Sequence, residues 1–474
     1  MKRRTLIAQA VCLTCLGPAF STPLQAALSL SKDVDVIVVG AGAAGLAAAL
    51  SAAENGAKVV LLEKADFIGG DSLVSGGYMN APGSQPQKDK GIVDSADLFY
   101  EHIMASGQGL NSPELARVMA DNALETFHWL TKNGVHFENN VYQIYGSGFQ
   151  RTLRASAPQG KGYIEALSDA CLARGVEIRT SCAVKDLVKD QESGRITGVR
   201  YAVGNSSELL QLSCNRGVVL AAGGFGANRE MLSRWAPAVK DFPTDTGKGS
   251  TGEVLEAAMR VGAQTTNLNI VECIPEGAAT HDQSVRLYVV MEGLLFVNKK
   301  GERFIDEAAG RDALGKALIE QGPENCFTLV DSANVAKLDR LQQKNLYRAY
   351  FAGQAWRADS LNDLADMLGI DFGNLQKSLN ELPEKRRLVK PPFWAMKMHL
   401  WIHYTLGGVM IDHNAQCLDA ENRPIPGLYA AGQITGNVHG ANRLGGNGLT
   451  DALVFGRIAG RSCAQSDAQK PGTA

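Results

Sequence analysis

The pattern of apolar positions begins with a strand, a helix and a second strand in close succession. Residues 35–39 read Asp-Val-Ile-Val-Val, a short apolar run typical of a buried strand. Residues 46–55 are rich in alanine and favour a helix, and Gly56 stands where that helix would end. Residues 58–62, Lys-Val-Val-Leu-Leu, give a second apolar strand. This order predicts a β-α-β unit with parallel strands.

Further strands and helices follow, and at about residues 270–402 the pattern changes to shorter helical segments and mixed strands. Before residue 270 we expect a helix at 162–174 and strands at 176–180, 183–188, 195–202, 209–213 and 217–222. The strands at 195–202 and 209–213 read as a small antiparallel meander. Later helices are expected at 340–351, 361–368, 372–382 and 449–463.

These elements predict an α/β fold in which a Rossmann-like dinucleotide-binding domain carries an inserted α+β capping domain. Glycine-rich segments like those near the beginning occur again near the end of the chain, so we expect the dinucleotide-binding domain to be discontinuous. Its predicted parts are residues 32–269 and 403–464, with the capping domain at residues 270–402. Residues 465–474 read as a polar tail. The cleft between the two domains would then lie over the cofactor.

The composition excludes several classes of protein. Of 474 residues, 45% are hydrophobic, 51 are glycine and 16 are proline, and the glycines follow no collagen-like period. The formal net charge is −2, without the basic surplus of a nucleic-acid-binding protein. We therefore expect a large folded protein with many close backbone approaches and no nucleic-acid partner.

Residues 1–26 have the features of a secretory signal peptide. A basic start that includes Arg3 and Arg4 precedes an apolar run at 6–20, and small residues end at Ala26. Either the general secretory route or the twin-arginine route fits this start. The alternative, a membrane anchor, needs about 20 apolar residues, more than this run supplies. We therefore expect a periplasmic protein that does not span the membrane.

The cysteines favour isolated thiols. Cys12 and Cys15 lie in the predicted signal peptide, and seven widely scattered cysteines remain. An odd, scattered set predicts neither a disulfide framework nor a metal site. No Cys-x-x-Cys-His sequence occurs, so we expect no covalently attached haem.

A glycine fingerprint lies between the first strand and the helix. Gly40, Gly42 and Gly45 form the spacing G-x-G-x-x-G. The first glycine allows a tight turn, the second allows backbone amides to approach a pyrophosphate, and the third allows close packing of helix on strand. Glu63 follows the second strand, where it can accept a hydrogen bond from a ribose hydroxyl. The unit predicts a dinucleotide and leaves FAD and NAD both open.

Two later glycine runs can also lie along an extended cofactor. One comprises Gly69, Gly70, Ser75, Gly76 and Gly77, and the other comprises Gly223 and Gly224 at the end of a buried strand. The alternative interpretation of the first run is an ordinary surface loop.

Several segments together resemble the fumarate reductase and succinate dehydrogenase flavoprotein family, with closest likeness to its soluble periplasmic branch of flavocytochrome c fumarate reductases and urocanate reductase. These segments are residues 40–45, Glu63-Lys64, Gly69-Gly70, 220–226, 301–304, Glu307, Arg311-Asp312, 403–408 and 439–447. They cover nearly all of the chain after the predicted signal peptide, in family order.

The resemblance implies a non-covalently bound FAD that gives hydride from N5 to the C=C bond of an unsaturated carboxylate resembling fumarate, urocanate or acrylate. It implies Arg311 as the proton donor, and His403 and Arg443 as the residues that hold a substrate carboxylate. The alternative for Arg311 is a structural ion pair with Asp312 or Glu307. The alternatives for His403 and Arg443 are a packed core histidine and a helix-cap contact.

The resemblance also makes the first domain an FAD-binding domain and adds residues to the cofactor site. The added positions are Ala41, Ala44, Lys64, Ala183, Val184, Ala222, Gly432, Gln433, Asn447, Gly448 and Leu449.

The sequence departs from the family pattern at the substrate site. Ile274-Pro275-Glu276 stands where the fumarate-specific branch has His-Pro-Thr, so one carboxylate-binding histidine is missing. Glu292 lies in a shortened segment, which puts the family's proton relay in doubt, and Gln433 replaces a glutamate. Groups that could meet the far end of the substrate are Glu276, His281, Arg286 and Tyr288.

The electron donor is expected to be a separate c-type cytochrome or quinol-linked protein, because the chain carries no haem motif. The alternative activity is the reverse reaction, a flavin-dependent dehydrogenase of a succinate-like or ketosteroid-like substrate. Arg443-Leu444-Gly445-Gly446 stands where the ketosteroid branch has a Pro-Gly-Gly motif, which argues against a ketosteroid. A third hypothesis is a flavoprotein that only passes electrons.

Overall fold

The computed structural model describes residues 34–144, 146–277, 285, 287, 292–338 and 340–468. By its internal contacts the chain divides into residues 1–32 and residues 33–474. The predicted signal peptide at residues 1–26 and residues 469–474 of the predicted polar tail lie outside the described residues.

The β-α-β unit predicted at the N-terminal end is present. It consists of β1 (Val36–Val39), α1 (Ala43–Glu54) and β2 (Val59–Leu62), and β1 pairs with β2 in parallel with Val36 opposite Val59. All residues of both strands are buried, as their uniformly apolar sequence requires.

This unit lies within a six-stranded sheet whose order is β17-β18-β9-β1-β2-β5. The additional strands are β5 (Glu177–Arg179), β9 (Gly217–Leu220), β17 (Gln416–Leu418) and β18 (Pro424–Ala430). β18 pairs in parallel with β9, with Leu428 opposite Val218. Strands from the beginning and from the end of the chain therefore belong to the same sheet.

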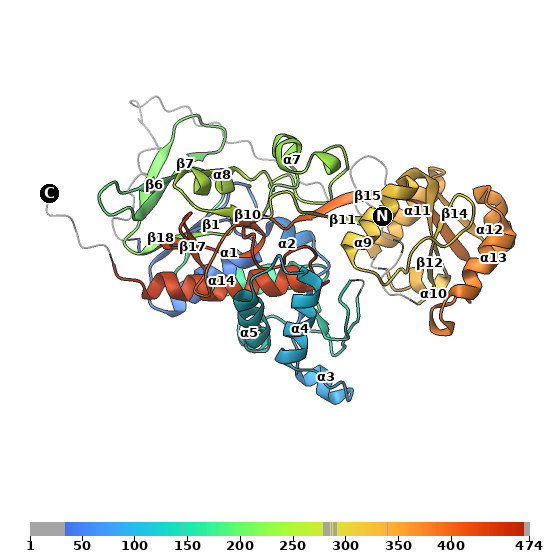
Figure 1. Ribbon diagram of the computed structural model, residues 1–474. Coiled ribbons are helices and arrows are strands. Elements are labelled where there is room, and N and C mark those ends of the chain that lie inside the picture. The colour runs from blue at the N-terminus through green and yellow to red at the C-terminus, as the bar shows by residue number, and fades with distance from the viewer. Residues whose placement is uncertain are drawn as a thin grey trace, which may run out of the picture. The chain divides into compact units, whose positions relative to one another are not determined.

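The last helix, α14 (Asn447–Gln465), packs along α1, and Figure 1 shows the two helices side by side. A Cβ atom added at Gly456 would lie 2.5 Å from the Ala44 carbonyl oxygen. One added at Gly460 would lie 2.0 Å from the Ala48 carbonyl oxygen. The two helices thus approach so closely that only glycine fits at these positions.

Two long helices cover a stretch in which the sequence analysis predicts no element. They are α4 (Ala96–Gly107) and α5 (Pro113–Lys132). Ser95 caps α4 by accepting a hydrogen bond from the Leu98 amide, and Ser112 caps α5 in the same way. The neighbouring elements are α2 (Gly70–Val74), β3 (Tyr78–Asn80), α3 (Gln85–Asp89), β4 (Thr152–Arg154) and α6 (Lys161–Ala173).

The predicted antiparallel meander is confirmed and gains one strand. Its strands are β6 (Cys182–Lys189), β7 (Ile196–Val203) and β8 (Leu210–Ser213). The elements that complete this part of the chain are α7 (Arg229–Trp235), η2 (Pro237–Val239), α8 (Glu253–Arg260), β10 (Thr265–Thr266), β16 (Gly408–Val409) and η5 (Gly432–Ile434).

A second, antiparallel sheet lies in the middle of the chain, in the order β11-β15-β13-β12, with β14 also paired to β15. Its strands are β11 (Val271–Gly277), β12 (Leu294–Asn298), β13 (Cys326–Val330), β14 (Ala355–Ala358) and β15 (Phe393–Thr405). Its helices are α9 (Arg311–Gln321), η3 (Pro323–Asn325), α10 (Ser332–Val335), α11 (Arg340–Phe351), α12 (Leu361–Leu368), α13 (Phe372–Glu381) and η4 (Glu384–Arg386). Figure 1 shows α11, α12 and α13 gathered around these strands.

This part of the chain has a hydrophobic core cluster of its own, which includes Leu295, Leu329 and Leu364. The strand β15 continues through residue 403, where the second part of the dinucleotide-binding domain is predicted to begin. Because residues 33–474 form one compact unit by their contacts, the bounds 32–269, 270–402 and 403–464 stay a prediction.

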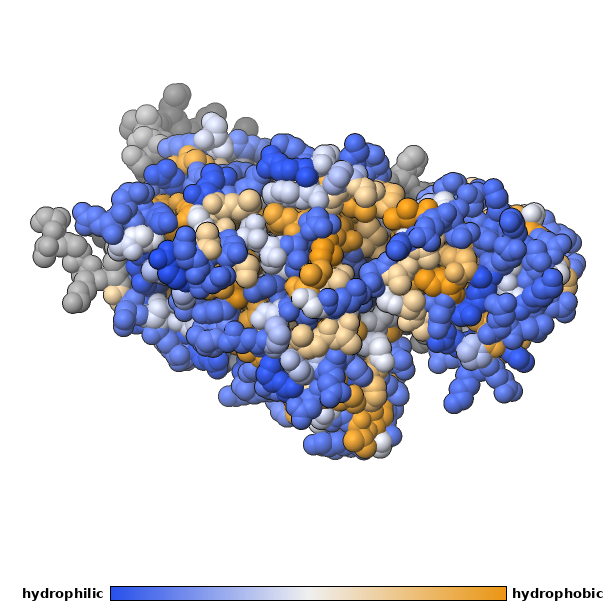
Figure 2. Space-filling model, in the orientation of Figure 1, coloured by the Kyte–Doolittle hydropathy of each residue, from blue (hydrophilic) through white to orange (hydrophobic). Residues whose placement is uncertain are grey.

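The surface is mainly hydrophilic in the view of Figure 2, with smaller apolar patches between the polar residues. None of the helices that the structure describes is both long enough and apolar enough to cross a membrane. The prediction of isolated thiols is confirmed, since the described cysteines are all buried and free of disulfides.

Candidate active site

The glycine fingerprint forms a tight turn between β1 and α1. Gly40 has a φ of +102°, and a Cβ atom there would lie 2.4 Å from the Ala221 carbonyl oxygen just after β9. A Cβ atom at Gly45 would lie 1.8 Å from the Gly40 carbonyl oxygen. Glycine is therefore required for the turn and for the approach of α1 to it, as the fingerprint predicts.

Glu63 lies at the end of β2 with its carboxylate against this turn. Oε2 accepts a hydrogen bond from the Ala41 amide at 2.8 Å, and Oε1 accepts one from the Ala65 amide at 2.9 Å. A carboxylate keeps further lone pairs after two such bonds. The predicted acceptance of a ribose hydroxyl is therefore compatible with this geometry and stays a prediction.

The predicted segment at Gly69 and Gly70 lies against the same turn. The Gly69 amide donates to the Ala41 carbonyl at 2.9 Å, and the Ser72 hydroxyl accepts from the Ala43 amide at 3.1 Å. This contact occupies one of the free amides in the first turn of α1. Lys64 donates to the Thr251 hydroxyl at 2.7 Å, and burial lowers the pKa of its ammonium group.

The second glycine run meets residues from the end of the chain. A Cβ atom at Gly224 would lie 2.1 Å from the Thr405 hydroxyl oxygen and 2.9 Å from Nε2 of Gln433. This Nε2 atom is buried and has no hydrogen-bond partner within the part of the chain that the structure describes. An amide donor without an acceptor, beside a glycine that leaves space, fits a bound group such as a cofactor.

The remaining predicted cofactor residues are spread over five places. Gly77 lies against Gln159, whose carbonyl oxygen would be 2.1 Å from a Cβ atom at Gly77, so Ser75 and Gly76 belong to a turn packed on that segment. Ala183 and Val184 lie at the start of β6, whose first amide donates to the Glu63 carbonyl at 2.7 Å. The others lie at the end of β9 or at the start of η5 and α14: Ala222, Gly223, Gly432, Asn447, Gly448 and Leu449.

Two of the three predicted catalytic residues meet through a residue that the sequence analysis missed. Glu272, on β11, uses Oε1 to accept hydrogen bonds from Arg311, at the start of α9, and from Arg443, the latter at 2.7 Å. The side chains of Glu272, Arg311 and Arg443 are only 2%, 8% and 5% exposed. The structure therefore places one carboxylate between the two arginines.

The ionisation of Glu272 follows from its neighbours. Burial by itself would raise the pKa of this carboxyl, but the charges of Arg311, Arg443 and His403 outweigh burial and lower its pKa from 4.5 to about 2. Glu272 is therefore a carboxylate at neutral pH. Its Oε2 atom and Nε of Arg443 are buried without hydrogen-bond partners among the described residues.

The acids considered as structural partners of Arg311 have other partners. Asp312 accepts a hydrogen bond from Gln108 at 2.8 Å. Glu307 is fully buried and pairs with Arg303 at 2.8 Å. Arg311 forms an ion pair with Glu272.

His403 lies at the end of β15 and is partly exposed, so it is not a packed core histidine. Its Nδ1 atom lies 2.7 Å from Oδ2 of Asp245, and its charge acts on Glu272. A carboxylate in this position orients the imidazole ring. His403 is thus held by Asp245 and lies close enough to Glu272 for its charge to act there.

Arg443 is held by aromatic and ionic neighbours. Its guanidinium carbon lies 4.6 Å from the ring centroid of Tyr404, a cation–π distance. The Tyr404 ring in turn packs edge-on against His439, whose Nε2 atom lies 3.2 Å from Asp451. Burial, together with the charge of Asp451, raises the pKa of Tyr404, so this phenol stays neutral.

Asp71 lies on α2, in the segment that includes Gly69 and Gly70, and is affected by the charges of Asp245 and His403. Its carboxylate accepts hydrogen bonds from the Ser250 hydroxyl and the Gly247 amide, both at 2.5 Å. Burial raises the pKa of Asp71, with Asp245 as a further cause and His403 acting in the opposite direction.

Of the relay and substrate groups considered above, the structure describes Glu292 and Glu276. Glu292 is exposed, and its carbonyl oxygen accepts a hydrogen bond from Asn334. Glu276 is buried on β11. His281, Arg286 and Tyr288 lie outside the described residues.

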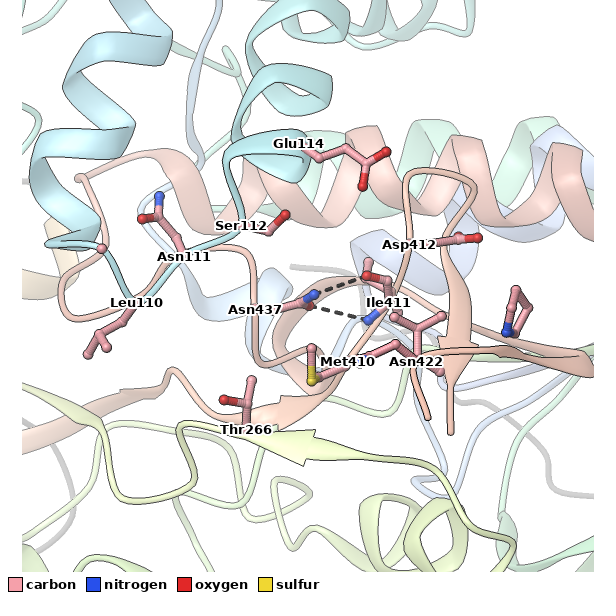
Figure 3. Close-up of a pocket in the computed structure, with 13 residues that line it drawn as sticks. Leu110, Asn111, Ser112, Glu114, Thr266, Met410, Ile411, Asp412, Asn422 and Asn437 are labelled. Carbon is pink, nitrogen blue, oxygen red and sulfur yellow. Dashed lines mark hydrogen bonds between the residues drawn. The ribbon is translucent and has the colours of Figure 1, made fainter. Parts of the chain in front are cut away.

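A separate cavity of about 440 Å³ lies at the start of α5 and the segment after β16. Figure 3 shows Asn437 in its wall, joined to the backbone of Ile411 by two hydrogen bonds, of 3.0 and 3.3 Å. Its lining includes none of Arg311, His403 and Arg443, so this cavity is not the candidate active site.

These features define the class of protein. A parallel sheet with a three-glycine turn after its first strand and a carboxylate after its second is typical of dinucleotide-binding proteins. Residues 35–449 match the family model described as FAD binding domain, and the chain belongs to this family. The cofactor is therefore FAD, and the protein is an FAD-dependent oxidoreductase.

Individual relatives narrow this class. Fumarate reductase (cytochrome) of Shewanella frigidimarina is 32% identical over 461 residues, covering 93% of this chain and 79% of that protein. Urocanate reductase of Eggerthella lenta is 32% identical over 468 residues, covering 93% and 76%. The open conformation of a flavocytochrome c3 fumarate reductase matches with a TM-score of 0.72 and 31% identity, over 93% of this chain and 79% of that one.

These similarities confirm the family resemblance and the predicted fold class, a mixed α/β fold with an FAD-binding domain and a capping domain.

Proposed function

We propose that this protein reduces the C=C bond of an α,β-unsaturated carboxylate with hydride from FAD. The observation that carries the proposal is the buried pair of Arg311 and Arg443, with His403 close enough to act electrostatically on their shared partner Glu272. The similarity to fumarate and urocanate reductases supports the same reaction class.

The residues present fit a bound FAD. Gly40, Gly42 and Gly45 would hold the pyrophosphate, Glu63 the ribose, and the open amide donor of Gln433 the isoalloxazine ring. No histidine lies between residues 71 and 75, so we propose non-covalent binding. When bound and reduced, the flavin supplies the hydride.

Arg443 and His403 would bind the substrate carboxylate. Hydride addition at the carbon β to a carboxylate moves negative charge toward that carboxylate. Fixed cationic donors stabilise this charge more strongly in the transition state than in the ground state. The stacking of Arg443 on Tyr404 and the pairing of His403 with Asp245 fix both donors in advance.

Arg311 would donate the proton to the other alkene carbon. A guanidinium normally stays charged, so donation requires a group that returns the proton. Glu292 is exposed, whereas Glu272 is in direct hydrogen-bond contact with Arg311. Glu272 is ionised at neutral pH and carries no proton to return, so we propose that the proton returns to Arg311 from solvent.

We further propose that the protein is exported to the periplasm and receives its electrons from a c-type cytochrome or a quinol-linked protein. The basic start, apolar run and small residues of residues 1–26 support export.

A panel of unsaturated acids tests the proposed reaction. The FAD-loaded protein is reduced without oxygen and mixed with fumarate, urocanate, acrylate or cinnamate, and the return of flavin absorbance is followed. We expect at least one acid to reoxidise the flavin well above the rate in buffer. If no acid exceeds the buffer rate, the proposed function is wrong.

A further inference from the structure

A protein carboxylate already occupies the place between the two arginines that are proposed to meet the substrate. Glu272 Oε1 is bonded to both guanidinium groups, and its side chain is only 2% exposed. A substrate carboxylate must therefore share the arginine pair with Glu272 rather than receive both guanidinium groups.

Carboxylates of the protein already accompany the cations at this point. Among the described residues, Glu272 is paired with Arg311 and Arg443, and Asp245 is paired with His403. The buried carboxylate of Asp71 also lies near Asp245 and His403. A second uncompensated negative charge in a buried site is strongly disfavoured.

Few hydrogen-bond donors at this point remain available to a ligand. Nε of Arg443 is buried and has no hydrogen-bond acceptor among the described residues. His403 is partly exposed, so it can be reached from solvent. Together they suit one carboxylate group.

The strand that carries Glu272 adds no positive charge along its length. Ile274 and Glu276 follow on β11, and both are buried, at 3% and 1% exposed. Trp401, opposite Ile274 on β15, is apolar and buried as well. None of these three side chains offers a positive charge to a second carboxylate.

We propose that Glu272 is a specificity-determining residue that restricts the site to monocarboxylate enoates with an uncharged far end, by repelling a second carboxylate. This inference rests on the proposed reduction of an unsaturated acid. Repulsion of an unwanted ligand is a general route to specificity, because discrimination depends on the difference between two affinities.

Glu272→Gln keeps the shape of the side chain and removes its charge. In the FAD-loaded full chain we expect the wild type to have a higher kcat/KM for acrylate and cinnamate than for fumarate. We expect E272Q to shift this ratio toward fumarate by about tenfold or more. Wild-type preference for fumarate, or an unchanged ratio in an E272Q protein that retains FAD, would overturn the proposal.

Two further variants separate charge from folding. Glu272→Asp keeps the charge and should keep the preference for monocarboxylates. Glu307→Gln removes another buried carboxylate from an arginine pair in the same part of the chain, so it serves as the matched control. A shift in E307Q as large as that in E272Q would contradict a specific role for Glu272.

A binding measurement distinguishes this inference from the proposed function. Propionate and succinate are titrated into the oxidised holoprotein, and flavin absorbance reports their binding. We expect succinate to bind about tenfold more tightly to E272Q than to the wild type, with little change for propionate. If no acid is reduced but this difference appears, the proposed reaction fails and the charge selection by Glu272 stands. An equal response of both acids would overturn the selection.

Discussion

At the scale of single residues, the electrostatics of the site converge on Glu272. Its carboxylate joins Arg311 on α9 to Arg443 near the end of the chain, and all three side chains are nearly inaccessible to water. A buried ion pair of this kind strongly destabilises a protein when one partner is removed, because the other charge is left uncompensated. Glu272 therefore matters for stability as well as for the substrate.

The lowered pKa of Glu272 predicts a pH-dependent stability. Its folded-state pKa of about 2 lies below the ordinary value of 4.5, so its contribution is complete above pH 4.5 and is lost as the pH falls toward 2. The shift corresponds to about 3 kcal/mol. Urea unfolding at several pH values between 6 and 2 should show this loss in the wild type.

E272Q is the reference for this measurement, because glutamine does not titrate. The free energy of unfolding of the wild type should fall more steeply with decreasing pH than that of E272Q. Parallel curves for the two proteins would contradict the paired carboxylate.

The contacts of Glu272 with the two arginines could not be predicted from the sequence. Arg311 and Arg443 could be proposed from motifs, because both lie in segments that resemble the family. Glu272 is separated from Arg311 by 39 residues and from Arg443 by 171. No local pattern encodes such a contact; the signal in the sequence is the presence of two acids, Glu272 and Glu276, in a strand that is largely buried.

At the scale of elements, the contact between α1 and α14 positions the cofactor turn. The start of α1 adjoins Gly40, and its body lies against Gly456 and Gly460 of α14. A change that separates the two helices therefore displaces the N-terminal turn of α1 from the place where it would meet a pyrophosphate.

Gly460→Ala tests this coupling. The new Cβ atom would lie 2.0 Å from the Ala48 carbonyl oxygen, so the helices must move apart. We expect a loss of about 1–3 kcal/mol in the free energy of unfolding, as for other overpacked interiors. FAD affinity, measured by the return of flavin fluorescence on dilution, should weaken in parallel.

Gly315→Ala is the matched control. Gly315 also lies within a helix, α9, but the nearest atom to an added Cβ is the Cys273 carbonyl oxygen at an ordinary 3.9 Å. Alanine should be tolerated there or should stabilise the helix slightly. Equal destabilisation by both substitutions would show that close helix contact is not the cause.

The elements that could be predicted are those with a strong local signal. Uniformly apolar strands such as β1 and β2, and the amphipathic helices α11 and α12, match their predicted ranges closely. The helices α4 and α5 were not predicted, although their serine caps are a local signal that could have located them. The pairing of β15 with both β11 and β13 arises from contacts between distant parts of the chain, which hydrophobic periodicity does not encode.

At the scale of the whole molecule, the described chain combines a cofactor fold with a buried cluster of charged side chains. The glycine turn and β9 would provide the cradle for FAD, β11 and α9 provide Glu272 and Arg311, and the segment before α14 provides Arg443. The proposed reaction needs all of these segments, because the cofactor turn and the charged side chains come from different parts of the chain.

The most direct test of the proposed reduction is a single turnover of the wild type and Arg311→Ala. Each FAD-loaded protein is reduced without oxygen and mixed with the most reactive acid of the panel; flavin absorbance and the saturated acid are both measured. Arg357→Ala serves as the control, because Arg357 is an exposed arginine on β14. We predict one saturated acid per reduced flavin in the wild type and in R357A, and flavin reoxidation at least about 100-fold slower in R311A with FAD still bound. Near-wild-type turnover in R311A, or reoxidation without formation of the saturated acid, would contradict the account.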